Sequence, residues 1–311
     1  MTAWGRLLRL SLLPSAAADV AAGLVLGFAG DWPGGSAPWL LILSSVFVYH
    51  GSLALNDWAD RVHDARTRPD RPIPAGHVTP AAALTTGVAL QAIGVAWAWL
   101  ASPVTGLWMA GIALAALFYD VKGRGPILGP GLLALCRGAN LAVGLVYARD
   151  VQLPRPLETD PAGLPIGLWT VPVLYGLYVF AVSRMGRLED GEDSDIGERP
   201  RKFLFVAAAC LLAVSLVQVE DTLFLDPWRS LSFAVAGFGA FGLLRTALAT
   251  KHWDRAAVGR AMGSALRRLL AFTAAAALLP LSDGTDGLIV ALAILAGYPL
   301  AFLLRGLFPP S

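Results

Sequence analysis

The chain is a succession of apolar stretches, most of them about 20 residues long, and short segments between them carry most of the charges. A helix of roughly 20 apolar residues crosses the hydrocarbon core of a bilayer, so this series predicts a polytopic membrane protein. The composition agrees, because 56% of the 311 residues are hydrophobic and 15% are charged, whereas soluble domains carry about 25% charged residues. The candidate spans are residues 10–30, 38–56, 80–101, 103–120, 126–147, 166–186, 202–220, 229–249, 262–281 and 286–305.

These spans predict an all-α fold, a single transmembrane helical bundle of nine or ten helices over residues 1–311. The ninth span is the least regular, because Arg267 and Arg268 lie within it and would have to extend toward the interface. Pro14 and Asp19 interrupt the first apolar stretch, and many further spans follow it. We therefore interpret that stretch as a transmembrane helix and not as a signal peptide.

The positive charges favour one side of the membrane. With the N-terminus inside, 20 of the 24 Lys and Arg residues fall on the inner side, as the positive-inside rule requires. We therefore expect an integral protein of a bacterial inner membrane with a cytoplasmic N-terminus. The two charged loops, residues 57–79 and 187–201, then face the cytoplasm together.

Net charge and cysteine spacing argue against two other classes of protein. A net charge of +2 is too small to indicate a nucleic-acid partner. Cys136 and Cys210 lie in apolar stretches 74 residues apart, and the sequence has no CxxC pair. They predict buried thiols, with neither a disulfide framework nor a zinc site.

A polar motif ends the second span, reading Asn56-Asp57-Trp-Ala-Asp60-Arg-Val-His-Asp64. If the helix continues through it, Asp60, Asp64 and Asp57 lie ~40°, ~80° and ~100° around the axis from Asn56. Carboxylates this close repel one another unless a cation neutralises them. Hard oxygen ligands suit Mg²⁺, which binds through a few carboxylates plus substrate phosphates. The motif therefore predicts a magnesium site, and the alternative is a solvated acidic helix end.

An arginine-rich segment, Arg66-Thr-Arg68-Pro-Asp-Arg71-Pro-Ile-Pro-Ala-Gly76, follows the motif. Guanidinium groups bind phosphate oxygens bidentately, and the prolines stiffen the segment so that the arginines are presented at little entropic cost. The segment predicts a phosphate-bearing ligand beside the magnesium site. The alternative is ordinary enrichment of basic residues on the inner side.

The pattern NDxxDxxxD followed by RPxPxG resembles the UbiA family of intramembrane prenyltransferases. Asn56, Asp57, Asp60 and Asp64 match the first family motif residue by residue. The resemblance implies an all-helical enzyme in which two Asp-rich motifs hold Mg²⁺ and a prenyl diphosphate in a cavity that faces the cytosol. Segments 11–19 (SLLPSAAAD) and 136–140 (CRGAN) resemble the EboC-like bacterial branch of the family.

Further segments match the family less fully. Tyr119, Lys122 and Arg124 resemble its Tyr-plus-basic segment, although Asp120 stands where many members have Pro. Arg9 and Pro14 resemble the residues that open the family's first helix.

The second family motif, DxxxD, is altered in this chain. Glu189 and Asp193 have the required spacing, with Glu in place of the first Asp, but the acidic residues begin about a turn late, after Arg184 and Arg187. The resemblance implies metal ligands among Glu189, Asp190 and Asp193. The alternative is a solvated loop balanced by its own arginines.

Two ionisable residues, Asp19 and Arg137, lie deep inside predicted spans, away from their ends. Asp19 and Arg137 both fall roughly 16–18 Å below the inner interface, at 1.5 Å per residue, so we predict that they form a buried ion pair. The alternative is that Arg137, with Asn140 one turn further on, points toward a diphosphate. Tyr49 shares a helix face with Asn56 and is predicted to line the cavity.

Together these features predict Mg²⁺-dependent transfer of a prenyl group from a prenyl diphosphate to a small-molecule acceptor that the sequence does not specify. The alternatives are a membrane transport or trafficking component that reuses the fold, and a structural scaffold. The expected catalytic motif is Asn56, Asp57, Asp60 and Asp64; the diphosphate ligands are Arg66, Arg68, Arg71, Lys122, Arg124 and Arg137; and the cavity residues are Tyr49, Tyr119, Asn140 and Asp19.

Overall fold

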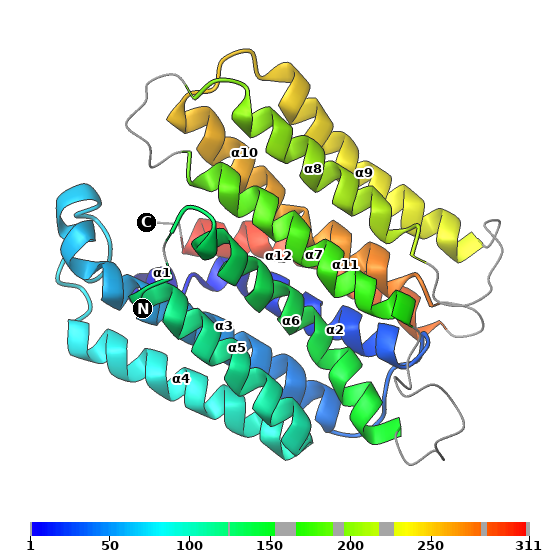
Figure 1. The fold of residues 1–311 in the computed structure, drawn as a ribbon. Coiled ribbons are helices and arrows are strands. Elements are labelled where there is room, and N and C mark those ends of the chain that lie inside the picture. Colours follow the sequence, from blue (N-terminus) through cyan, green and yellow to red (C-terminus); the bar gives the residue numbers. More distant parts are fainter. Residues whose placement is uncertain are drawn as a thin grey trace.

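The computed structural model describes residues 2–123, 125–152, 166–188, 196–217, 227–280 and 285–308, and the regular structure within these ranges is entirely helical (Figure 1). The helices are α1 (Thr2–Leu7), the 3₁₀ turn η1 (Leu10–Leu12), α2 (Leu13–Gly27), α3 (Ala37–Thr67), α4 (Pro80–Ala101), α5 (Pro103–Val121), α6 (Leu128–Gln152), α7 (Ile166–Gly186), α8 (Arg199–Val214), α9 (Pro227–Ala249), α10 (Arg255–Arg267), α11 (Leu269–Ala277) and α12 (Asp286–Leu307).

Eight helices in the described ranges are long and apolar enough to cross a membrane. The all-helical membrane class is therefore confirmed, whereas the predicted count of nine or ten spans is not. The predicted span 202–220 overlaps α8, which has 16 helical residues and ends at Val214. The predicted span 262–281 is divided between α10 and α11 at Arg268, whose guanidinium donates to the carbonyl groups of Ser264 and Gly239.

Apolar side chains cover much of the outer surface of the bundle. Phe238 on α9 and Phe302 on α12 are 80% and 78% exposed, and α4 and α5 also present exposed Leu, Val and Trp side chains. Of the 18-residue apolar segment of α4, only 22% is buried inside the bundle, and the share is the same for α12. In water such a surface would promote aggregation, so hydrocarbon is its natural solvent.

Local sequence signals set where several helices begin. Thr79 and Ser102 cap α4 and α5 by accepting hydrogen bonds from backbone N–H groups, and a proline follows each of them at the first helical position. Asp254 caps α10 in the same way. These residues satisfy N–H groups that the first helical turn leaves unpaired.

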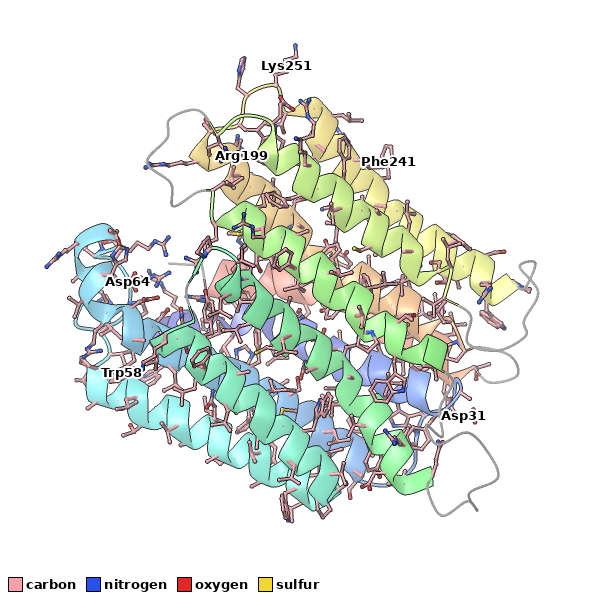
Figure 2. The ribbon with its side chains drawn as sticks, in the orientation of Figure 1. Asp31, Trp58, Asp64, Arg199, Phe241 and Lys251 are labelled. Carbon is pink, nitrogen blue, oxygen red and sulfur yellow. The ribbon has the colours of Figure 1, made fainter. Side chains whose placement is uncertain are left out.

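The helices form a central group flanked on two sides (Figure 1). Helix α2 contacts α3, α6, α11 and α12, whereas α3 packs against α4 and α5, and α8 lies between α7 and α9. Both chain ends lie at one end of the bundle, and Asp64 is seen at that end in Figure 2.

The crossing between α2 and α6 is tight. A Cβ placed on Gly144 would overlap the backbone of Gly23 and Leu24, and one on Gly23 would overlap the carbonyl of Leu141. Small residues at such a crossing allow the backbones of membrane helices to approach closely. This contact brings Asp19 on α2 beside α6, which carries Arg137.

Replacing Gly144 with alanine is expected to lower the melting temperature by several degrees, because overpacking a tight contact costs about 1–3 kcal/mol. Thermal unfolding in detergent measures the effect. Gly111→Ala is the matched control, since no atom lies within 4 Å of a Cβ at that helical position. Equal melting temperatures for the two variants would contradict the tight α2–α6 crossing.

Candidate active site

The Asn/Asp motif predicted from the sequence, residues 56–64, lies on the last turns of α3 (Figure 2). The chain leaves the helix at Arg68 and returns beneath it in a series of turns, with Gly76 in the left-handed region at φ 76°. Ile73 and Val78 are buried against Leu7 and anchor this return. The turns therefore place Arg71 against the face of α3 that carries the acidic residues.

Two arginines neutralise two carboxylates at this point. The Arg71 guanidinium lies 2.6 Å from Asp64 and 3.4 Å from Asp57, and Arg9 lies 2.8 Å from Asp57. Both carboxylates are 2% exposed. Asp57, Asp64, Arg9 and Arg71 are called the carboxylate cluster below.

Asp120 on α5 adds a carboxylate near this cluster. The Asn56 side-chain amide donates to Asp120 Oδ1 at 2.8 Å. Asp120 is 7% exposed and lines the cavity described next. A hydrogen bond between α3 and α5 therefore fixes the orientation of the amide that opens the motif.

A cavity of about 280 Å³ runs from Asn56 and Asp120 into the bundle. Ser45, Tyr49, Ser52 and Asn56 line it from a single face of α3, spaced so that they fall within about 60° around the helix axis. The remaining wall is largely apolar, with Ile112, Ala116, Leu133, Cys136, Val179, Leu266 and Leu269. The cavity therefore combines a polar face of α3 with a wall that is mainly apolar.

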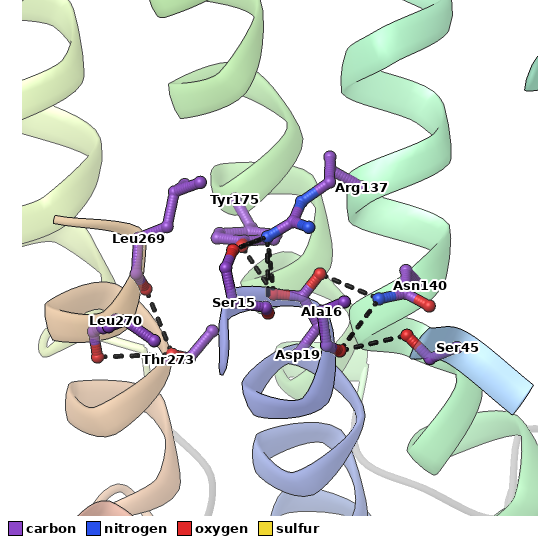
Figure 3. Close-up of polar contacts among 10 residues, drawn as sticks. All are labelled: Ser15, Ala16, Asp19, Ser45, Arg137, Asn140, Tyr175, Leu269, Leu270 and Thr273. Carbon is purple, nitrogen blue, oxygen red and sulfur yellow. Dashed lines mark hydrogen bonds and ion pairs between the residues drawn. The ribbon is translucent and has the colours of Figure 1, made fainter. Parts of the chain in front are cut away.

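A buried polar network closes the deep end of this cavity (Figure 3). Arg137 Nη2 lies 3.0 Å from Asp19 Oδ1, and it also donates to Ser15 Oγ at 2.5 Å and to Tyr175 at 2.7 Å. The Tyr175 hydroxyl donates to Asp19 Oδ1 at 2.6 Å, and Asn140 donates to Asp19 Oδ2 at 2.9 Å. The predicted ion pair between Asp19 and Arg137 is confirmed.

The other predicted site residues lie in different environments. Tyr49, Tyr119 and Asn140 line the cavity as expected. Arg71 is buried in the carboxylate cluster, whereas Arg66, Arg68 and Lys122 are exposed. The predicted ligands Arg124, Glu189, Asp190 and Asp193 lie outside the described residues.

The described residues contain no group of three His, Cys, Asp or Glu side chains gathered closely enough to hold a metal ion. Magnesium nevertheless fits this donor set, because it usually binds through one or two carboxylates together with substrate phosphates and water. Asp57 Oδ2 is buried and has no hydrogen-bond partner in the described chain, so one hard oxygen is available. Asp60 lies one turn before Asp64 and is half-buried.

Four contributors to these sites were not predicted as site residues from the sequence. Ser15 and Tyr175 complete the buried polar network, whereas Arg9 and Asp120 were noted only in relation to a family pattern. Tyr175 gives no sequence signal, because a tyrosine in an apolar span is most often packed between helices. Asp120, an acidic residue at the inner end of a span, is a signal that could have been followed.

Comparison with known proteins places this geometry in context. The model of the UbiA prenyltransferase family matches residues 17–267. The bacteriochlorophyll synthase 33 kDa chain of Cereibacter sphaeroides is 36% identical over 115 residues, which are 34% of this chain and 38% of that protein. The digeranylgeranylglyceryl phosphate synthase of Natronomonas pharaonis is 30% identical over 194 residues, 56% of this chain and 62% of that one. The match thus spans less than two thirds of either relative.

A solved structure shares the fold. It is that of a UbiA homologue from Archaeoglobus fulgidus bound to GPP and Mg²⁺, with a TM-score of 0.60 over 97% of this chain and 99% of that one. The two sequences are 14% identical, so the likeness concerns the arrangement of helices alone.

Proposed function

The chain belongs to the UbiA prenyltransferase family, and from this premise we propose that it transfers a prenyl group from a prenyl diphosphate to a small-molecule acceptor. The observation that carries the proposal is the cavity itself. It opens beside the carboxylate cluster, where a charged diphosphate and Mg²⁺ can be bound, and it continues into a largely apolar interior.

In this proposal the diphosphate lies at the inner end of α3. Asp57, Asp60 and Asp64 hold Mg²⁺, which when bound neutralises the diphosphate and stabilises it as a leaving group. Arg71 and Arg9 adjoin this position, and the exposed Arg66, Arg68 and Lys122 can approach from solvent. Arg124 is assigned to the same group from its place in the sequence.

The chain's own residues then assist the transfer in two ways. Guanidinium groups stabilise the negative charge that develops on the diphosphate as the bond between its oxygen and the prenyl C1 breaks. The apolar wall, which includes Ile112, Leu133 and Val179, keeps water from the electron-poor prenyl carbon until the acceptor attacks it. Both effects require a largely apolar cavity that opens beside the carboxylate cluster.

The decisive test is Mg²⁺-dependent stabilisation of the purified protein by geranyl diphosphate, followed by incubation with labelled diphosphate and a cell extract to identify a prenylated product. Stabilisation that requires Mg²⁺, and a labelled product, are expected. No stabilisation with or without Mg²⁺ would contradict the proposal. The transport alternative drew on Asp19 and Arg137 as parts of a polar pathway, but these residues bind each other, so no observation favours it.

We also propose that the end of the cavity beside the carboxylate cluster faces the cytoplasm of a bacterial cell. The distribution of Lys and Arg supports this orientation. Cysteines introduced by Thr67→Cys and Ser194→Cys are expected to resist an impermeant thiol reagent in intact cells and to react after lysis. Labelling of only one site in intact cells would show that the two charged loops do not share a side.

Asp120 is expected to act as a positioning residue through its hydrogen bond to Asn56. Asp120→Ala should lower kcat/KM for geranyl diphosphate about tenfold, the effect of losing one hydrogen bond at a charged site. Asp120→Asn keeps an oxygen that can accept from Asn56, so it should recover most of the loss. If both variants lose activity equally, the charge of Asp120 matters and its hydrogen bond does not.

A further inference from the structure

The arginine at the deep end of the cavity uses only part of its hydrogen-bonding capacity. Arg137 directs Nη2 to Asp19, Ser15 and Tyr175. Its Nε and Nη1 atoms are buried and have no hydrogen-bond partner within the described ranges. Leaving a buried donor of a charged group unpaired costs more than a hydrogen bond normally contributes. Two such donors on one side chain point to a ligand that accepts hydrogen bonds from them.

These donors adjoin the cavity. Arg137 lines it and is 8% exposed. The ring of Tyr49, which lines the same cavity from α3, lies over the guanidinium with its centroid 5.2 Å from Cζ. A change in the Tyr49 rotamer would uncover the guanidinium for a molecule in the cavity.

The charge of the network restricts which ligand it accepts. Asp19 is fully buried and already neutralises Arg137 at 3.0 Å. An anionic group added here would leave a net negative charge deep inside the bundle, where solvation is weak. A carbonyl or hydroxyl oxygen accepts the same N–H groups and adds no charge.

The spacing of the two polar ends restricts the length of the ligand. Tyr49 precedes Asn56 by seven residues on α3, about 10 Å along the helix axis. A molecule that reacts beside Asn56 and reaches Arg137 must span a comparable distance, as two fused rings or a chain of similar length do.

We propose that Arg137 binds a neutral oxygen of the acceptor, so that the acceptor is an elongated, uncharged carbonyl or hydroxyl compound. This inference rests on the proposed function, since it takes the cavity to hold the acceptor. It makes Arg137 a residue that selects the acceptor and removes it from the diphosphate ligands predicted from the sequence.

Two naphthols of matched shape test the charge preference. 6-Acetyl-2-naphthol carries a neutral ketone and 6-hydroxy-2-naphthoate a carboxylate at the same position. Fluorescence titration of the wild-type protein with geranyl diphosphate and Mg²⁺ present should give a Kd at least about tenfold lower for the ketone, because the carboxylate would add an uncompensated charge beside a pair that is already neutral. Equal affinity, or tighter binding of the carboxylate, overturns the proposal.

Arg137→Lys tests the donors themselves, because lysine can keep the ion pair with Asp19 but lacks Nε and Nη1. It should weaken binding of 6-acetyl-2-naphthol at least about tenfold. Ser232→Ala is the control: it removes a buried hydroxyl that does not line the cavity, lowers the melting temperature and leaves the affinity for the ketone within about twofold. Unchanged affinity in Arg137→Lys overturns the proposal.

Binding of geranyl diphosphate separates the two hypotheses. If Mg²⁺-dependent binding of the diphosphate persists in the wild type and in Arg137→Lys while the naphthols bind without preference, only the acceptor inference fails. If the wild-type protein does not bind geranyl diphosphate at all, the proposed function fails, and the acceptor inference fails with it.

Discussion

Asp64→Ala and Asp60→Ala should each abolish Mg²⁺-dependent binding of geranyl diphosphate, with affinity falling by at least about 100-fold, because each removes a carboxylate proposed to hold the metal. Asp64 is 2% exposed and holds Arg71 at 2.6 Å, so its loss also frees the guanidinium that the cluster positions. Isothermal titration in detergent with and without Mg²⁺ measures the effect.

Asp70→Ala is the matched control for this pair. Asp70 is an exposed carboxylate in the turns that follow α3, and it contributes its backbone carbonyl, not its side chain, to a hydrogen bond from Arg6. Its replacement should leave binding unchanged within about twofold. The melting temperature of each variant without ligand separates loss of the site from loss of the fold. Retained affinity in both Asp60→Ala and Asp64→Ala would remove the metal assignment.

Helical periodicity was enough to place the motif, because residues 56–64 continue the second apolar span without a breaker. The structure extends α3 to Thr67, and Asp57 and Asp64 meet at Arg71. Periodicity could not predict which helix packs against this face of α3. The hydrogen bond from Asn56 to Asp120 depends on α3 packing against α5, and a tertiary contact of that kind is not encoded in the spacing of either helix.

The buried ion pair was also predicted only in part from the sequence. Similar depth in the membrane predicted that Asp19 and Arg137 would pair, since an isolated charge there is costly. The tyrosine that bridges them, Tyr175, could not be predicted, because the face of α7 that meets α2 and α6 depends on how three helices pack. The span count differed for two local reasons: α8 has 16 helical residues, and α10 ends at Arg267, which divides the predicted span 262–281.

The largest stability effect is expected from the pair at the deep end of the cavity. Asp19→Asn and Arg137→Gln should each lower the free energy of unfolding by about 3–5 kcal/mol, because each leaves the opposite charge buried without its partner. Asp19 is fully buried and Arg137 nearly so, so water cannot replace the missing group. Equilibrium unfolding of the purified protein in detergent micelles measures each loss.

The double variant distinguishes an ion pair from two independent polar contacts. In Asp19→Asn/Arg137→Gln no net charge remains, and the two amides can hydrogen-bond to each other, to Tyr175 and to Asn140. We therefore expect the double variant to recover at least about 1 kcal/mol relative to the sum of the single losses. Ser232→Ala removes a buried hydroxyl bonded to Ser215 and to the Ala275 carbonyl, on helices that do not carry the pair. Combined with Arg137→Gln, this control should be additive within about 0.5 kcal/mol. Additivity in the Asp19 and Arg137 cycle as well would mean that the two side chains do not stabilise the bundle as a pair.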